Sequence, residues 1–386
     1  MNDSVSVIGA GMTPMSRRDM STTELATLAA TEALADAGLK PKEVGLVLAA
    51  NALGGNLNDQ ACIRGQSWLK PLDLDGVGVI NIDNSCASGS SAFHLGVMAA
   101  GGGASPVLVI GTEKMWTGDR AATIAGIEEG LPAYEREQLR ERFSFAGTTL
   151  MGLNSVWVNH QVAIRGTTVE QIAATAVKAR RFGAMNPLAQ FRKEVTLEEV
   201  IASPVVADPL RRLMCSSFTD GAAAVVLASG KLRDAPRVLA SIVRSGTGDT
   251  EYHERLGQVA EETWKAAGVG PQDLDLIELH DATSAEELYA LEALGFFPPG
   301  DAGAATIAGA TLPGGKAVCS NPSGGLVARG HPIGATGLCQ IVEVVQQLRG
   351  RAGDRQVAGA VLGGAVNTGG LVNADPATVS VAVLGR

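Results

Sequence analysis

The chain has 386 residues, of which 46% are hydrophobic, and its formal net charge is −9 at pH 7. A chain of this length and composition can bury a large core and is not expected to be disordered. Because phosphate binding requires a basic surface, the acidic balance and the absence of a Lys/Arg-rich run argue against a nucleic-acid partner. No apolar run is long enough to cross a bilayer and the N-terminus is not basic, so we predict no membrane span and no secretory signal.

Apolar and amphipathic segments alternate along the first part of the chain. We predict a strand beginning at 5–8, a helix at 22–39 capped by Ser21 or Thr22, a buried strand at 44–49, a small-residue helix at 87–100 and another buried strand at 106–111. Buried strands that alternate with helices predict an α/β fold with a largely parallel sheet covered on both faces.

The same plan recurs further along the chain. Segment 37–47 resembles segment 267–277, with Gly38 matching Gly268 and Pro41 matching Pro271 at a constant shift of 230 residues. The second copy continues into a predicted helix at 334–348 and a predicted strand at 357–362. We interpret this as a duplicated unit, although a helix–Gly–turn–strand junction is also common in unrelated α/β proteins.

A more polar stretch separates the two copies. We expect three parts: an N-terminal half at 1–116 plus 205–236, an inserted loop domain at 117–204 that covers the substrate, and a C-terminal half at 237–386. A buried strand at 220–227 returns the chain to the first half.

Cys86 stands between a predicted strand and the small-residue start of a helix. A helix N-terminus stabilises a thiolate, and the end of a strand in an open α/β sheet is where ligands bind. The alternative is a buried, inert cysteine. The chain has five cysteines and no CxxC pair, which favours reduced thiols in a cytoplasm over disulfides or a metal site. We assign three of the others to the core and regard one as incidental: Cys215, Cys319 and Cys339, and Cys62.

His331 lies in a glycine-rich loop, 321–337, that Pro332 stiffens. A rigidly mounted imidazole is suited to act as a general base, and we predict that it activates Cys86. The alternative is a structural histidine bonded to loop carbonyls. In duplicated halves, equivalent strand ends meet across a pseudo-two-fold axis, which would bring Cys86 and His331 together.

Two further segments carry polar groups that suit an oxyanion site. His280 follows the buried strand 276–279, and we interpret it as an oxyanion donor. Asp281 either orients that loop or caps the helix that follows. Segment 363–370 offers backbone N–H groups for a second oxyanion site with the Cys86 amide, or is an ordinary loop. Its candidate residues are Gly363, Gly364, Gly369 and Gly370.

These segments together resemble the thiolase superfamily, in particular sterol-carrier-protein-type thiolases and archaeal-like acetyl-CoA acetyltransferases. The matching segments are 81–93, 111–115, 186–193, 207–210, 217–223, 280–281 and 321–337. The resemblance implies a duplicated, five-layered α-β-α-β-α fold with an inserted loop domain. It implies Cys86 as the acylated nucleophile, His331 as base and oxyanion donor, and His280 as second donor. From the matching segments we assign Asn321, Gly325 and Arg192 to substrate binding.

The chain departs from the family pattern in one respect. Thiolases usually carry a second cysteine that moves the α-carbon proton, either after the His-Asp pair or near the C-terminus. Here these positions hold Ala282 and Asn367, and no cysteine follows Cys339. A different base, such as His280, His331 or the substrate itself, would have to move that proton.

The resemblance implies a coenzyme A-dependent C-acyltransferase that cleaves or forms a 3-oxoacyl-CoA through an acyl-Cys86 intermediate. We keep two alternatives: a retro-aldol lyase that acts on a β-hydroxyacyl-CoA, and a non-catalytic acyl-CoA-binding scaffold subunit. Coenzyme A is expected as a substrate, with no covalently bound cofactor and no metal. The expected partners are a second copy of the chain and a small zinc-containing OB-fold subunit of the kind that relatives use.

Overall fold

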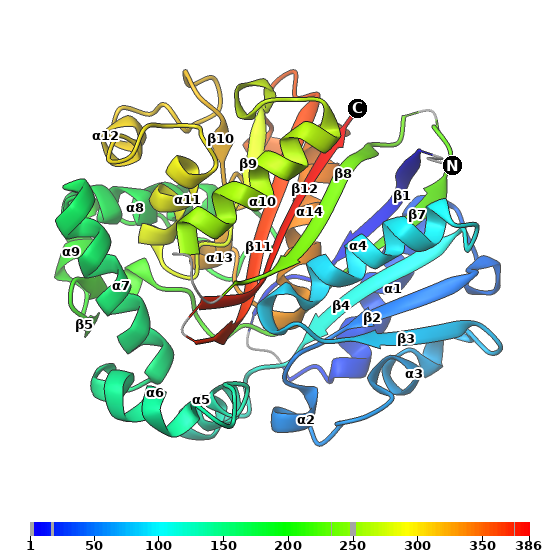
Figure 1. Cartoon of the computed structure of the whole chain (residues 1–386). Helices are drawn as coiled ribbons and strands as arrows, with labels where there is room; N and C mark the ends of the chain where they lie inside the picture. The colour runs from blue at the N-terminus through cyan, green and yellow to red at the C-terminus, as the bar shows by residue number, and fades with distance from the viewer. Residues whose placement is uncertain (1–3, 17–18, 233, 248–251, 374) are drawn as a thin grey trace.

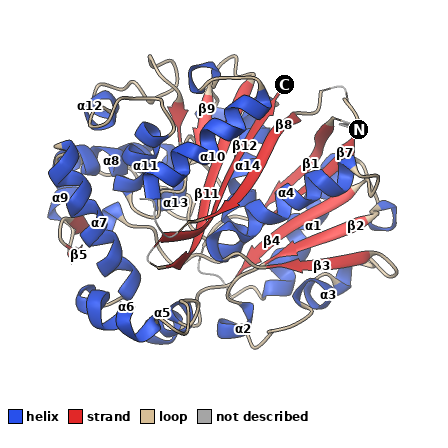
Figure 2. Cartoon of the chain, in the orientation of Figure 1, coloured by secondary structure: helices blue, strands red, loops and turns tan. Residues whose placement is uncertain are grey.

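The computed structural model describes residues 4–16, 19–232, 234–247, 252–373 and 375–386. Within these residues ten strands form one sheet in the order β10-β9-β11-β12-β8-β1-β7-β4-β2-β3 (Figures 1 and 2). The sheet is mixed, so the prediction of a largely parallel sheet is wrong: β7, β8 and β12 run antiparallel to their neighbours. The first half contributes β1 (Val5–Met12), β2 (Leu46–Ala50), β3 (Gly78–Ile82), β4 (Val107–Glu113) and β7 (Gly221–Ser229). The second half contributes β8 (Arg237–Ser245), β9 (Leu276–Glu278), β10 (Cys319–Ser320), β11 (Leu362–Val372) and β12 (Asp375–Gly385).

The two halves repeat one another across the middle of this sheet. Strands β1 and β8 meet over two residue pairs, and the strand order outward from them is equivalent on both sides. Helix α1 (Thr22–Ala37) and helix α10 (Tyr252–Ala267) have bounds that differ by 230 residues. The caps that follow, Gly38 and Gly268, have φ angles of 67° and 70°. This is the left-handed region that favours glycine, so the duplication predicted from these two glycines is confirmed.

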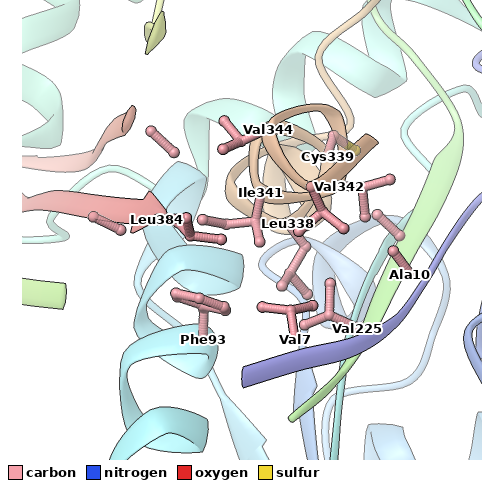
Figure 3. Close-up of a cluster of buried hydrophobic side chains, with 14 of the residues drawn as sticks. Val7, Ala10, Phe93, Val225, Leu338, Cys339, Ile341, Val342, Val344 and Leu384 are labelled. Carbon is pink, nitrogen blue, oxygen red and sulfur yellow. The ribbon is translucent and has the colours of Figure 1, made fainter. Parts of the chain in front are cut away.

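The elements stack in five layers, because the strands of each half form one layer and α14 packs between them, against β7 on one side and β11 on the other. Helix α1 packs on the outer side of the first-half strands, and α10 packs on the outer side of the second-half strands. Helices α4 (Ser88–Gly101) and α14 (Thr336–Leu348) lie between the two halves and contact each other. Figure 3 shows this central layer, where Leu338 and Ile341 of α14 pack among Phe93, Val7 and Leu384. Because α14 is buried on nearly all sides, its polar side chains Gln340, Glu343 and Gln347 form internal hydrogen bonds, with Val366, Arg355 and each other.

The inserted segment is mostly helical and packs against the second half (Figure 1). It contains α5 (Arg120–Glu128), α6 (Arg136–Phe143), α7 (Thr149–Arg165), α8 (Val169–Met185) and α9 (Leu197–Ala202), and the two short strands β5 (Val205–Ala207) and β6 (Leu210–Arg211) follow it. Buried Lys178 of α8 forms an ion pair with Glu287, and Arg165 of α7 forms one with Glu292. Both carboxylates belong to α11 (Ser284–Ala293), so α11 anchors the insertion.

The remaining helices are short: α2 (Gly54–Leu57), α3 (Arg64–Trp68), α12 (Ala302–Ile307) and α13 (Gly325–Ala328). No helix in the part of the chain that the structure describes has the length and apolarity needed to cross a membrane.

One predicted element is misplaced. The strand expected at 357–362 is wrong: the strand begins at Leu362, where Asp275 accepts hydrogen bonds from the backbone N–H groups of Val361 and Leu362. The glycine-rich segment predicted as a loop is the strand β11 itself. Small residues suit β11 because it lies close to side chains on both faces: a Cβ at Gly363 would lie 2.8 Å from Val344, and one at Gly364 would lie 2.9 Å from Leu274.

Candidate active site

Cys86 lies in a tight turn between β3 and α4. A single 3₁₀ turn, Ser85–Ala87, precedes the helix, and Ser85 has a left-handed φ of 53°. The Ser88 hydroxyl donates to the Ser85 carbonyl at 2.6 Å and accepts from the Asn84 N–H at 2.9 Å. Cys86 is partly exposed and contacts the apolar cluster around Leu53 and Met115. The strand–Cys–helix arrangement predicted from sequence is therefore confirmed, with strain stored next to the sulfur.

His331 is held by two threonines. Its backbone N–H donates to Thr219 Oγ1 at 3.0 Å, and its Nδ1 lies 2.7 Å from Thr336 Oγ1. The Thr336 hydroxyl donates its proton to the Pro332 carbonyl at 3.0 Å, so it accepts from His331. The proton of the neutral ring is therefore on Nδ1, and Nε2 is left as the basic nitrogen.

The starts of α4 and α14 come together because both helices have glycine there. A Cβ at Gly89 would lie 3.0 Å from the backbone N of Leu338, and one at Gly337 would overlap Ser90. The 3₁₀ turns before the two helices, Ser85–Ala87 and Ile333–Ala335, are related by a constant shift of 248 residues. By this shift, Gly334 occupies in the second half the position of Cys86 in the first.

The structure brings together the three residues that the sequence analysis places in the catalytic centre. One side-chain atom from each of Cys86, His280 and His331 lies within 4.8 Å of the other two. The two imidazoles meet edge to face, with ring centroids 5.2 Å apart and planes at 90°. His280 follows β9 in the second half, so the site draws on both halves of the duplicated fold.

All three groups are neutral at rest. Burial raises the pKa of the Cys86 thiol to about 12, and the nearby carboxyl groups of Glu113 and Glu286 act in the same direction. Burial lowers the pKa of His280 to about 4. Burial, followed by the neighbouring His280 and Arg329, holds the pKa of His331 well below its ordinary value of 6.5. The resting thiolate expected from the helix N-terminus is therefore wrong, because loss of solvent outweighs the helix dipole.

Asp281 supports the loop and does not cap the helix that follows it. Thr283 stands at the N-cap of α11, and Asp281 instead accepts from the backbone N–H of Leu326, in α13, at 2.7 Å. Gly325 is required at this contact, since a Cβ there would overlap the Asp281 carboxylate. Asn321 accepts from the Leu279 N–H at 2.7 Å, just before His280. Asn321 and Gly325 are buried and hold the His280 segment, and their assignment to substrate binding stays a prediction.

The four glycines assigned to an oxyanion site divide into two pairs. Gly363 and Gly364 lie at the start of β11, beside Leu276 and Ile277 of β9, and do not reach the Cys86 turn. Gly369 and Gly370 lie at its far end. A Cβ on Gly369 would be 2.8 Å from that of Ala87, and one on Gly370 would be 3.5 Å from that of Ser85. Arg192 is exposed in the loop after α8.

Sequence reasoning missed a layer of buried polar residues beneath the site. Glu113, at the end of β4, accepts hydrogen bonds from the backbone N–H groups of Ala52, Leu53 and Gly334 and thereby joins the two halves. Arg329 is fully buried and donates to Glu278 at 3.0 Å. The only signal in the sequence was Glu113, a charged residue at the end of an apolar strand.

The Cys86, His280 and His331 atoms are also of the kinds that bind a soft divalent cation such as Zn²⁺. Tetrahedral ligation with bond lengths of about 2.0–2.3 Å requires ligand atoms nearer to one another than 4.8 Å, so the three side chains would have to draw together. The observed spacing of the three atoms and the neutral thiol suit nucleophilic chemistry with no movement of the side chains.

The sequence matches two family models that together span most of the chain. Residues 5–231 match the thiolase N-terminal domain, and residues 247–386 match the thiolase C-terminal domain-like family. The chain belongs to the thiolase superfamily. It is a thiolase-type acyltransferase, in agreement with the resemblance seen in the sequence.

Curated relatives span almost the whole chain. The acetyl-CoA acetyltransferase of Methanothermobacter thermautotrophicus is 36% identical over 385 residues, covering 95% of this chain and 96% of the relative. Human sterol carrier protein 2 is 34% identical, covering 92% of this chain and 68% of the relative. The benzoylsuccinyl-CoA thiolase subunit BbsB of Thauera aromatica is 33% identical, covering 92% and 91%.

Solved structures share the fold at lower identity. An Ltp2-ChsH2(DUF35) aldolase superposes with a TM-score of 0.81 at 21% identity, covering 99% of this chain and 98% of that chain. Human mitochondrial 3-ketoacyl-CoA thiolase in complex with CoA gives 0.75 at 18% identity, covering 100% and 98%. The expected fold class is thus confirmed.

Proposed function

We propose that this thiolase-superfamily member is a coenzyme A-dependent C-acyltransferase that cleaves or forms a 3-oxoacyl-CoA through an acyl group on Cys86. The observation that carries the proposal is the convergence of Cys86, His280 and His331 within 4.8 Å. The orientation of His331 supports it, since the Thr336 contact leaves Nε2 as the basic nitrogen.

In the cleavage direction, His331 Nε2 takes the proton of the Cys86 thiol as Sγ attacks the β-carbonyl carbon. Negative charge moves to the carbonyl oxygen, which the His280 ring and the backbone at the Cys86 turn and Gly369 stabilise. The C–C bond then breaks and the acyl group stays on sulfur. The thiol of a second coenzyme A attacks this thioester and releases the acyl group as acyl-CoA, and Cys86 regains the proton from His331.

The test is covalent labelling. The protein is incubated with acyl-CoA, digested and examined by mass spectrometry, and we expect the acyl group on the peptide that carries Cys86. Cys86→Ala should abolish labelling and turnover while the melting temperature stays within a few degrees of the parent. Cys339→Ala is the matched control, because that thiol is buried in the central layer. An unlabelled Cys86 peptide alongside full turnover would refute the mechanism.

A retro-aldol lyase is the second candidate. Ala282 and Asn367 stand at the two positions where thiolases usually have a second cysteine, and retro-aldol cleavage of a β-hydroxyacyl-CoA needs no acyl-enzyme. Retained lyase activity in Cys86→Ala would favour it. Tight acyl-CoA binding without turnover for any acyl group would favour a non-catalytic scaffold subunit.

The proposed partners are acyl-CoA, a second copy of the chain and a small OB-fold subunit that contains zinc. Strand β3 is an edge of the sheet, and apolar Ile80, Leu95 and Met98 are exposed on β3 and the neighbouring α4, which supports pairing with a second copy. The aldolase that shares the fold is named as a complex with a DUF35 component, which supports the small subunit. Arg192 remains our candidate for binding coenzyme A, and a cytoplasmic location remains part of the proposal.

A further inference from the structure

The proposed reaction needs an acid that the Cys86–His331 pair does not provide. When the C–C bond breaks, the α-carbon must receive a proton, while the proton from Cys86 remains on His331 for the later return to sulfur. Ala282 has no titratable group. Cys215 packs beside this loop, but its thiol donates to the Arg211 carbonyl at 3.4 Å, away from the site.

Glu286 lies directly beneath the loop that carries His280. It occupies the first turn of α11, and its Oε2 accepts from the backbone N–H of Ala282 at 2.9 Å. The side chain is buried, with 7% of the residue exposed. The Ala282 carbonyl accepts from the Ser216 N–H at 2.9 Å, so the loop and the carboxyl group are fixed together.

The charge of this carboxyl group, which hydrogen bonds fix beside the loop, also acts on the nucleophile. The charge of Glu286 raises the pKa of two thiols, Cys86 and Cys215, which lie on different segments. Burial raises the pKa of Glu286 itself to about 8, against the hydrogen bonds from the Ala282 and Thr283 backbone. At neutral pH it is therefore mostly a protonated acid with a proton to give.

We propose that Glu286 is the catalytic acid and base that exchanges the α-carbon proton, taking the place of a second thiol at Ala282. This inference rests on the proposed acyltransferase function and names the residue that completes it.

The proton balance closes without any added reagent. As the bond between the α- and β-carbons breaks, its electron pair remains on the α-carbon, in conjugation with the thioester carbonyl. The Glu286 carboxyl gives its proton to that carbon, which produces the shortened acyl-CoA and leaves a carboxylate. The carboxylate then regains a proton from solvent water, and the incoming coenzyme A releases its thiol proton to solvent as its sulfur attacks acyl-Cys86, so Glu286 returns to its starting state without taking part in transfer of the acyl group. In the synthetic direction the same carboxylate removes the α-proton.

The experiment separates two half-reactions of the full-length protein. Acylation of Cys86 by acetyl-CoA needs no α-carbon proton and is followed by mass spectrometry. Exchange of the acetyl-CoA methyl protons in D₂O requires only removal and return of an α-carbon proton, and it is followed by NMR. The variant is Glu286→Gln, whose amide oxygen can still accept from Ala282. The matched control is Cys215→Ala, which removes the neighbouring thiol.

We expect Glu286→Gln to acylate Cys86 within about threefold of the parent and to lose exchange by about a hundredfold or more, the usual range for a general acid–base group. Cys215→Ala should keep both. Exchange retained in Glu286→Gln would overturn the inference, as would loss of both half-reactions in that variant, which would indicate mere loop support. A parent protein that acylates but never exchanges would overturn it as well, whereas a parent that does not acylate refutes the proposed function itself. If Glu286→Gln does not fold, Glu286→Asp must lose more exchange than acylation.

Discussion

Gly369 has little space for a side chain, because β11 contacts the turn that carries Cys86 at this position. A methyl group on Gly369 would lie less than 3.0 Å from the Ala87 amide nitrogen and the Asn84 carbonyl oxygen, and 2.8 Å from the Ala87 Cβ. Ordinary contacts begin at 3.4 Å, so the turn or the strand must move by at least 0.6 Å. Two of the three contacts are backbone atoms, which cannot rotate away.

We therefore expect Gly369→Ala to lose about 1–3 kcal/mol of folding stability through overpacking. Its larger effect should be on the reaction, since misplacing reacting atoms by about 1 Å costs on the order of a hundredfold in rate. The assay pairs a denaturant titration with the rate of Cys86 acylation. Gly363→Ala is the matched control, because it lies in the same strand away from the Cys86 turn and its new methyl group would meet a side chain, that of Val344 at 2.8 Å, and no backbone atom. Equal acylation rates in the two variants at equal stability would refute the reasoning.

Three further outcomes follow from the site. Thr336→Val removes the acceptor of His331 Nδ1–H, and a hydrogen bond to a charged imidazolium contributes about 1.5–3 kcal/mol, so acylation should slow by roughly 10- to 100-fold with the fold intact in a thermal melt. Since the pKa of His331 lies well below 6.5, its base form persists on acidification, and acylation measured by quenched flow should stay level from about pH 8 to 6; a halving near 6.5 would contradict this. Zn²⁺ should inhibit reversibly and compete with alkylation of Cys86, and inhibition that leaves the rate of Cys86 alkylation unchanged would place the ion elsewhere.

The sequence was informative where local chemistry decides the structure. The bounds of α1 were predicted closely because Ser21 accepts from the Glu24 N–H and Gly38 ends the helix in the left-handed region. The Cys86 turn was also predictable, since a small-residue helix must follow a strand there. Strand β11 was not predictable, because its glycines pack against Leu274, Val344 and the Cys86 turn, which are distant in sequence. Local propensity predicts a loop, and tertiary packing overrides it.

The polar layer under the site was hidden for a related reason. Glu113 ends a strand whose seven residues are all buried. Its hydrogen-bond partners, Ala52, Leu53 and Gly334, are distant in sequence, so local patterns do not predict them. Asn321 and Gly325 were found as parts of a motif, but their support of the His280 segment was not predicted. Whether a conserved-looking loop residue touches substrate or holds its neighbour depends on side-chain direction, which spacing alone does not encode.

The neutral resting state of the site has a consequence for when it reacts. Raising the thiol pKa from 9.0 to about 12 means that an isolated thiolate is disfavoured by about 4 kcal/mol relative to one in water. Attack on a carbonyl removes this penalty, because the negative charge passes from sulfur to an oxygen that lies among donors. The proton passes at the same time to a His331 ring whose Nδ1–H is already bonded to Thr336. Burial therefore keeps Cys86 unreactive until a carbonyl carbon is in place, and the same desolvation strengthens each hydrogen bond to the oxyanion once it forms.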